Sequence, residues 1–194
     1  MSYLPYNKIY AGLDISRLRD FLLTNPDCFG KYDLRKGSEG SVHYEMDDIW
    51  ARYANPDHGE KTGDWTYFAE EHDSEWYPIA DELPDVKRLC FEVMGLVDGE
   101  RLGGVLITRL PPGGRILEHV DSGWHATYYD KYFVPIANKT GATFGFKEGV
   151  IAPDEGDVWG FDNFYPHWVD NDTDDVRIAM IVCIKQNKFD RGGH

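Results

Sequence analysis

Apolar residues recur three or four positions apart in two stretches of the N-terminal half, as they do along one face of an amphipathic helix. The first stretch begins near Asp14, a residue suited to cap a helix, and ends around Thr24, because Pro26 disfavours helix in the residue before it. The second runs from about Pro84 to Leu96. The apolar faces consist of Ile15, Leu18, Phe21 and Leu22 in the first stretch and of Val86, Leu89, Cys90, Val93 and Met94 in the second. We therefore predict two helices.

After Asp98-Gly99 the pattern changes to short runs rich in β-branched and aromatic residues, separated by turns rich in Pro, Gly, Asn and Asp. Short strands at this spacing are typical of an antiparallel sandwich or barrel. The predicted strands are Val105–Leu110, Tyr132–Ile136, Thr143–Phe146, Val158–Phe161 and Val176–Ile184. The sequence thus predicts a mainly β fold in which N-terminal helices pack outside a C-terminal barrel.

The segment between the two helices, about residues 30–80, is polar and rich in aromatic residues. Its Gly, Asp, Asn and Pro content indicates loops with short strands, such as one around Ser41–Tyr44. The 194 residues suffice for one domain with a full core. We expect a single domain, 1–194, in which a helix-and-loop part, 1–100, packs on a core β-barrel, 101–187, that carries the functional site.

The net charge of −14 argues against a general affinity for nucleic acid phosphates or anionic membranes. No run of about 18 apolar residues is present and the N-terminus lacks a basic leader, so we expect neither a membrane span nor a signal peptide. The three cysteines form no CxxC pair and indicate neither a zinc site nor a disulfide framework. Buried, reduced thiols in a cytoplasmic protein are the expectation.

The first segment with recognisable chemistry is Leu117–Ser122, which contains His119 and Asp121. Side chains at positions i and i+2 of a strand point to the same face, so both residues could reach one metal ion. An imidazole nitrogen and a carboxylate oxygen suit divalent iron. Taken alone, a His-x-Asp triplet is a weak indication, because it arises often by chance.

Two further residues complete a candidate oxygenase site. His167, on a distant strand, would complete a facial triad of two histidines and one carboxylate, which leaves open positions on the metal for a bidentate 2-oxo acid and dioxygen. Arg177 follows an Asp-rich turn in an otherwise apolar run and could bind the distal carboxylate of 2-oxoglutarate as a bidentate pair. The alternative is an arginine at the strand mouth paired with Asp174 or Asp175.

With these elements in place, the stretch Gly103–Lys185 resembles the aspartyl/asparaginyl β-hydroxylase family of cupin-like 2-oxoglutarate oxygenases. The ordered matching elements are Leu110–Gly114, His119-Val-Asp121, Tyr132–Ile136, Gly156–Phe161, Pro166-His167 and Arg177. The resemblance implies a double-stranded β-helix of the jelly-roll or cupin type, and iron(II) bound by His119, Asp121 and His167. It also implies 2-oxoglutarate anchored by Arg177, with Lys131 or Tyr132 as a further co-substrate contact.

The activity that the resemblance implies is O2-dependent hydroxylation of an unactivated carbon of an amino acid, either free or within a peptide or protein. Iron-dependent halogenases lack the carboxylate that Asp121 supplies, so its presence favours hydroxylation. Two rivals stay open: a cupin-like module that binds a metal or a small acid without turnover, and a cupin lyase or isomerase that uses another metal. A nucleic-acid-modifying oxygenase is disfavoured by the acidic charge.

Several other residues are candidates for substrate contacts, each with a structural alternative. His125 could be a substitute metal ligand or a substrate contact, or a loop histidine over the cavity mouth. Trp124 could form a wall for the substrate or pack on its own scaffold. Asn163 could bind substrate or shape a turn. Trp50 and Arg52 could together bind an acidic substrate group. We expect His43, His58 and His72, scattered among polar residues, to be solvated.

Overall fold

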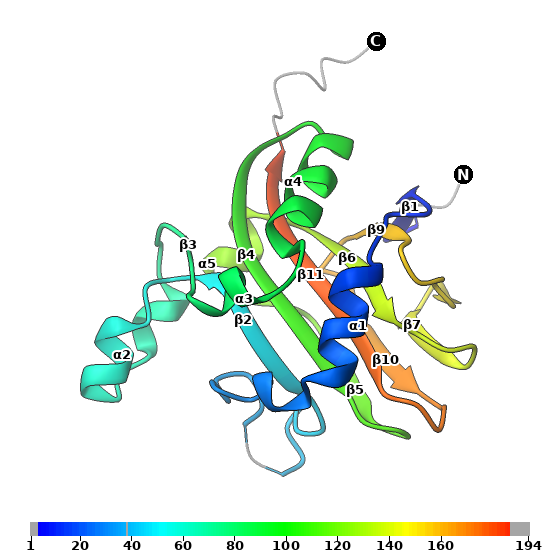
Figure 1. Cartoon of the computed structure of the whole chain (residues 1–194), viewed down its shortest axis with the longest axis horizontal. Helices are drawn as coiled ribbons and strands as arrows, with labels where there is room; N and C mark the ends of the chain where they lie inside the picture. Colours follow the sequence, from blue (N-terminus) through cyan, green and yellow to red (C-terminus); the bar gives the residue numbers. More distant parts are fainter. Residues whose placement is uncertain (1–3, 38, 187–194) are drawn as a thin grey trace.

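The structure is a computed structural model that describes residues 4–37 and 39–186, and its framework is two antiparallel β-sheets (Figure 1). The larger sheet has seven strands in the order β1-β9-β6-β11-β4-β2-β3, and the smaller has four in the order β5-β10-β7-β8. The strands of the larger sheet are β1 (Tyr6–Tyr10), β9 (Val158–Phe161), β6 (Asp130–Ala137), β11 (Arg177–Gln186), β4 (Gly99–Leu110), β2 (Asp47–Tyr53) and β3 (Glu75–Trp76). Those of the smaller are β5 (Arg115–His119), β10 (His167–Asn171), β7 (Ala142–Phe146) and β8 (Gly149–Ile151).

Two helices, α1 (Ser16–Thr24) and α4 (Val86–Leu96), lie across one face of the larger sheet (Figure 1). Their buried faces are the stripes predicted from the sequence, so both helix predictions are confirmed. The helices enclose the main core, whose fully buried members include Leu18, Leu22, Leu89 and Val93 from the helices and Ile107, Val134 and Met180 from the strands. Burial of this apolar surface is the main stabilising contribution in such a layer arrangement.

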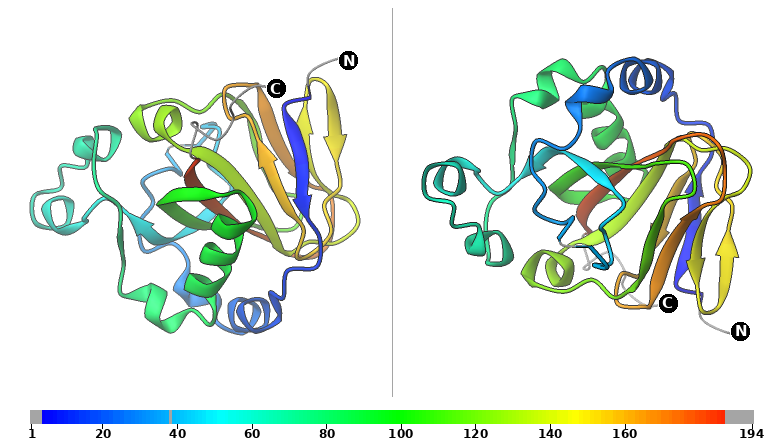
Figure 2. Two further views of the ribbon diagram at one scale, coloured as in Figure 1. Left: turned by 90° about the horizontal axis from the view of Figure 1, so that it is seen from above. Right: turned by 90° about the horizontal axis from the view of Figure 1, so that it is seen from below.

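The remaining helical segments are short and come mostly from the polar N-terminal part. They are the α-helices α2 (Asp57–Thr62), α3 (Ile79–Glu82) and α5 (Trp124–Tyr128) and the 3-10 helices η1 (Pro26–Cys28) and η2 (Thr66–Ala69). Figure 2 shows α2 at the side of the molecule, on the opposite side from the smaller sheet. Within residues 4–37 and 39–186, no helix is both long and apolar enough to cross a membrane.

The five predicted strands are all present, but β4 and β11 are longer than predicted and pair along most of their length, from Arg177↔Leu110 to Gln186↔Gly99. The sequence also missed strands in the part that it assigned to helix and loop. β1 pairs with β9 and β2 pairs with β4, so both extend the larger sheet. The strand predicted around Ser41–Tyr44 is wrong; that segment is a turn that leads into β2.

A cavity of about 250 Å³ lies between the two sheets. Alternation along each strand decides which side chains face it. Phe133 on β6 and Ala179 and Ile181 on β11 line it from the larger sheet, and Phe144 and Val169 line it from the smaller. The opposite residues of the larger sheet, such as Val134 and Met180, point to the helices instead. The middle of the cavity is therefore apolar, and any polar groups of the site must lie at its ends.

Candidate metal centre

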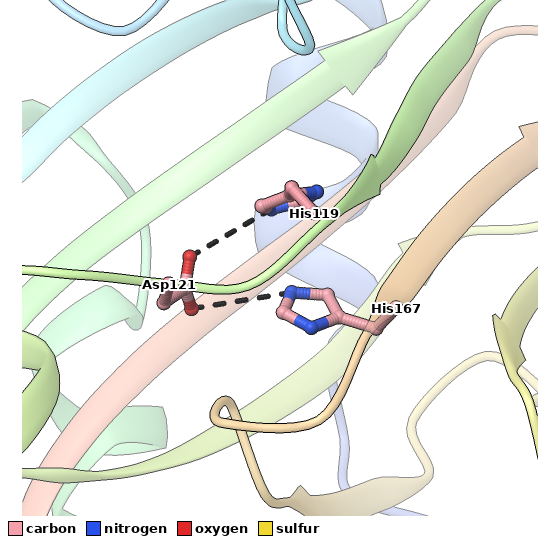
Figure 3. A group of neighbouring side chains, drawn as sticks. All are labelled: His119, Asp121 and His167. Carbon is pink, nitrogen blue, oxygen red and sulfur yellow. Dashed lines mark ion pairs between the residues drawn. The ribbon is translucent and has the colours of Figure 1, made fainter.

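Three potential metal ligands meet at the cavity, two from the end of β5 and the loop after it and one from β10 (Figure 3). His119 is the last residue of β5 and His167 is the first residue of β10, and the two residues are register partners. Asp121 follows two residues after His119. Nε2 of His119 lies 3.7 Å from Oδ1 of Asp121, and Nε2 of His167 lies 4.0 Å from Oδ2. One ligand atom from each residue falls within 4.8 Å of the others.

Asp121 reaches this position from a loop rather than from the strand that the sequence suggested. β5 ends at His119, and the backbone N–H of Asp121 donates to the carbonyl of Asn163 at 3.1 Å. This bond ties the loop after β5 to the turn before β10. The i, i+2 spacing therefore helps to place the carboxylate, but a contact between two loops determines where it points.

Both histidines are oriented for binding a cation. Nδ1 of His119 lies 2.8 Å from the carbonyl oxygen of Leu117, and Nδ1 of His167 lies 2.8 Å from that of Tyr165. A carbonyl oxygen can only accept, so each Nδ1 carries the proton and each Nε2 presents its lone pair to the site. Histidine ligands of protein-bound metals have this arrangement. The donor set and its supporting hydrogen bonds thus fit a divalent transition metal.

Lys131, on β6, forms an ion pair with Oδ2 of Asp121. Burial by itself would raise the pKa of Asp121, but the ion pair outweighs it, so the pKa lies below the usual value. Burial lowers the pKa of His167. At neutral pH the site therefore offers a carboxylate anion and a neutral imidazole, which are the forms that bind metals.

Arg177, the first residue of β11, lines the same cavity with only 4% of its surface exposed. Burial lowers its pKa to about 10, so it stays cationic at neutral pH. Within the described part of the chain, no hydrogen bond or ion pair to the Arg177 side chain occurs, and its Nε is buried without a partner. The alternative, a pair with Asp174 or Asp175, is absent there. A buried cation without an anionic partner is costly and indicates a site for an anion.

Some of the other candidates predicted from the sequence line the cavity, and others lie outside it. His125 lines the cavity, and its Nε2 accepts a hydrogen bond from the N–H of Gly104 at 3.0 Å. A Cβ at Gly104 would lie 2.8 Å from Cδ2 of Tyr53 and 3.1 Å from the His125 ring, so a larger residue there would displace these side chains. Trp124 stacks on Tyr128 and is not among the residues that line the cavity.

Asn163 and Tyr132 also lie outside the cavity. The buried side chain of Asn163 donates to the carbonyl of Ala126 at 3.1 Å, which supports the loop of Asp121. Tyr132 faces away from the site because it alternates with Lys131 and Phe133, and it belongs to the main core. Of the two predicted co-substrate contacts on β6, only Lys131 is placed for that role.

Sequence reasoning missed several cavity residues and misplaced Arg52. Arg35 and His43, from the turn-rich segment before β2, both line the cavity. His43 was expected to be solvated, yet its ring lies edge-on to that of His119 at 4.6 Å. Trp50 lines the cavity, whereas Arg52 lies over the Trp76 ring at 5.3 Å, outside it.

A bulge in β2 explains the position of Arg52. The pairing with β4 runs from Trp50↔Leu106 to Arg52↔Val105, so the register shifts by one residue between Trp50 and Arg52. A one-residue shift moves the following side chains to the opposite face of the sheet. Tyr53 consequently lines the cavity in place of Arg52. His72, also expected to be solvated, is half-buried against Tyr53 at 4.7 Å, and His58 is exposed as predicted.

A family model described as "Aspartyl/Asparaginyl beta-hydroxylase" matches residues 37–187, more than three quarters of the chain. The chain belongs to this family. The match covers both sheets except β1, and it includes the three clustered ligands and Arg177. The resemblance seen in the sequence is thereby confirmed, and so is the enzyme class, a hydroxylase. No curated protein matches the chain.

Solved structures with low sequence identity share the fold of this family member. A viral collagen prolyl hydroxylase from Paramecium bursaria Chlorella virus-1 has a TM-score of 0.55 at 14% identity, over 95% of this chain and 97% of that chain. A prolyl hydroxylase from Trichoplax adhaerens, in complex with a hypoxia inducible factor peptide fragment, has a TM-score of 0.55 at 12% identity, over 97% and 86%. A 2OG-Fe(II) oxygenase family oxidoreductase from Burkholderia pseudomallei has a TM-score of 0.54 at 11% identity, over 76% and 71%. These likenesses confirm the predicted jelly-roll fold.

Proposed function

We propose that this hydroxylase binds iron(II) through His119, Asp121 and His167 and anchors 2-oxoglutarate through Arg177. The observation that supports this most strongly is that a preoriented His-Asp-His cluster shares one cavity with an arginine whose side chain is buried without a partner among the described residues. The two groups match the two ends of a 2-oxo diacid: its oxo-acid end suits a metal, and its distal carboxylate suits a guanidinium.

The residues of the chain have separate tasks in this proposal. The two Nε2 atoms and the Asp121 carboxylate would hold the metal at the cavity. Lys131 keeps Asp121 ionised and in place. When bound, iron(II) with 2-oxoglutarate and O2 supplies the oxidising chemistry, in which succinate and CO2 form and one oxygen atom enters a C–H bond of the substrate. Phe133, Phe144 and Val169 form an apolar wall that excludes water.

We further propose that the hydroxylated carbon belongs to an amino acid, either free or within a peptide or protein. This substrate class follows from family membership and is compatible with the small cavity. Two alternatives remain, as the sequence suggested. A binding module would hold the metal and a small acid without turnover, and a cupin lyase or isomerase would act without 2-oxoglutarate. A nucleic acid substrate stays disfavoured by the charge.

Succinate formation from 2-oxoglutarate tests the proposal. Protein purified without oxygen should produce succinate after iron(II) and O2 are added, at a basal rate without substrate and faster with a productive amino acid or peptide. The His167→Ala variant should lose at least about 100-fold of this rate, because it lacks a metal ligand. The matched control is His58→Ala, since His58 is exposed and distant from the cavity. Iron binding without any succinate would contradict the proposal and favour a binding module.

A further inference from the structure

A second arginine, Arg35, lines the cavity from outside the two sheets. It lies in the turn-rich segment before β2, and 28% of its side chain is exposed. Arg177, by contrast, is fully enclosed at the start of β11. The sheet order β11-β4-β2 places the segment that follows Arg35 two strands away from Arg177. The cavity therefore has one enclosed guanidinium and one that solvent can reach.

Arg35 is held by a buried acid. Its Nη1 lies 3.4 Å and 3.5 Å from the two carboxylate oxygens of Asp48, and the Oγ1 of Thr108 donates to the same carboxylate at 2.9 Å. Asp48 and Thr108 are register partners on β2 and β4, so the rigid sheet fixes the acid. The contacts of Arg35 are long for charged hydrogen bonds. The guanidinium is thus positioned by Asp48 and keeps donors for another anion.

One imidazole separates Arg35 from the metal centre. Nη2 of Arg35 lies 3.4 Å from Nε2 of His43, whose ring is in edge-on contact with His119. A small anion bound by Arg35 would therefore lie near the proposed metal centre, with His43 between them. This arrangement suits a substrate in which one group is bound by Arg35 while a neighbouring carbon reacts at the metal centre.

Charge also favours an anionic substrate group. Lys131 balances Asp121, and Arg35 balances Asp48. If the proposed function holds, the divalent iron and the 2-oxoglutarate dianion balance each other, and Arg177 adds one positive charge that nothing else in the cavity cancels. A surplus charge in an enclosed apolar site favours a ligand that carries one further negative charge.

We propose that Arg35, positioned by Asp48, binds a carboxylate of the substrate and so determines substrate specificity. The proposal rests on the proposed function above, which assigns Arg177 to 2-oxoglutarate. The carboxylate could be the side chain of an aspartyl residue or the main-chain carboxylate of a free amino acid. Both sources present the same planar anion to the guanidinium.

Binding of matched acids and amides to protein loaded with iron(II) and 2-oxoglutarate, without oxygen, tests this inference. Calorimetry would compare acetyl-aspartate amide with acetyl-asparagine amide, which differ in the side-chain carboxylate. It would also compare asparagine with asparagine amide, which differ in the main-chain carboxylate. In the wild type, the acid of one pair should bind at least about tenfold more tightly than its amide, and that pair identifies the source.

The decisive variant is Arg35→Gln, in which this preference should fall to about twofold or less while the Kd of 2-oxoglutarate stays within about threefold. Arg109→Gln is the matched control: Arg109 is similarly exposed and pairs with the neighbouring Asp47 at 2.9 Å, outside the cavity. It should keep the preference. The double variant Arg35→Gln/Asp48→Asn removes the acid that Arg35→Gln leaves unpaired, and it should behave like the single variant if folding is not the cause.

Three results would overturn the inference: no acid preferred by the wild type, a preference that survives Arg35→Gln, or a loss of 2-oxoglutarate binding that accompanies the substitution. Failure of the proposed function would be seen separately, as a wild type that makes no succinate from 2-oxoglutarate.

Discussion

At the scale of single residues, several histidines at the site are buried in their neutral form. His125 is an example: its ring packs at 4.8 Å from that of Tyr53, and it accepts the backbone N–H of Gly104. A protonated imidazole could not accept that bond, and burial opposes its charge. Burial lowers the pKa of His125 to about 3, and it has the same effect on His43.

These histidines predict an acid sensitivity. The unfolded pKa is 6.5 and the folded pKa is about 3, so below pH 6.5 the unfolded chain binds protons that the folded chain excludes. As the pH falls from 6.5 to 3, each histidine should therefore lower the free energy of unfolding by about 1.4 kcal/mol per pH unit. Urea unfolding of wild type and His125→Gln at pH 7 and pH 5 measures this. Between pH 7 and pH 5 the free energy of unfolding should fall less for the variant than for the wild type. Equal decreases would show that His125 is not held in its neutral form.

The sequence identified the site residues that form a recognisable motif. It missed those that only the tertiary structure brings to the cavity. His119, Asp121, His167 and Arg177 were found because a strand repeat and a family-like order mark them. Arg35 and His43 belong to a turn-rich segment without periodicity, and only the pairing of β2 with β4 brings that segment to the cavity. No local signal distinguishes them from solvated residues.

At the scale of elements, helix α4 packs on β4 and β11, the two longest strands of the larger sheet. The helix follows Asp85, which has a positive φ of 61°, and its apolar stripe packs on β4 and β11. Its opposite face carries Phe91, which is 56% exposed. A strong amphipathic repeat explains why this element was predictable from the sequence.

Two substitutions on α4 test this packing. Leu89 has no exposed surface, so Leu89→Ala should lower the free energy of unfolding by about 2–5 kcal/mol, because it leaves a cavity in the main core. Phe91→Ala, on the exposed face, should change it by no more than about 0.5 kcal/mol. Urea unfolding measures both. Similar losses for the two variants would mean that the helix does not pack as described.

Most of the strands that the sequence missed are short or lie at sheet edges. β5 and β10 hold His119 and His167, which the sequence had already placed on strands, whereas β8 has three residues and β1 is a largely exposed edge strand of five residues. Such strands lack the alternation of a half-buried strand over enough positions to be recognised. β2 contains two consecutive acids and a bulge, so its residues do not read as a regular strand.

At the scale of the whole molecule, the two sheets and the N-terminal segments build the site together. The smaller sheet supplies both histidines, the larger supplies Lys131 and Arg177, and the segment before β2 supplies Arg35 and His43. The division into an N-terminal part, 1–100, and a barrel, 101–187, stays a prediction, although β1, β2 and β3 of the N-terminal part extend the larger sheet. The family match begins at residue 37, shortly before β2.

The central claim is that the His-Asp-His cluster and Arg177 bind iron(II) and 2-oxoglutarate as one site. Its most direct test is equilibrium binding of both ligands under anaerobic conditions to the wild type, His167→Ala and Arg177→Gln. We predict one iron(II) and one 2-oxoglutarate per wild-type chain. His167→Ala should bind neither tightly, and Arg177→Gln should keep the metal but bind 2-oxoglutarate at least about tenfold more weakly. Unchanged iron binding in His167→Ala, or unchanged 2-oxoglutarate binding in Arg177→Gln, would contradict the account.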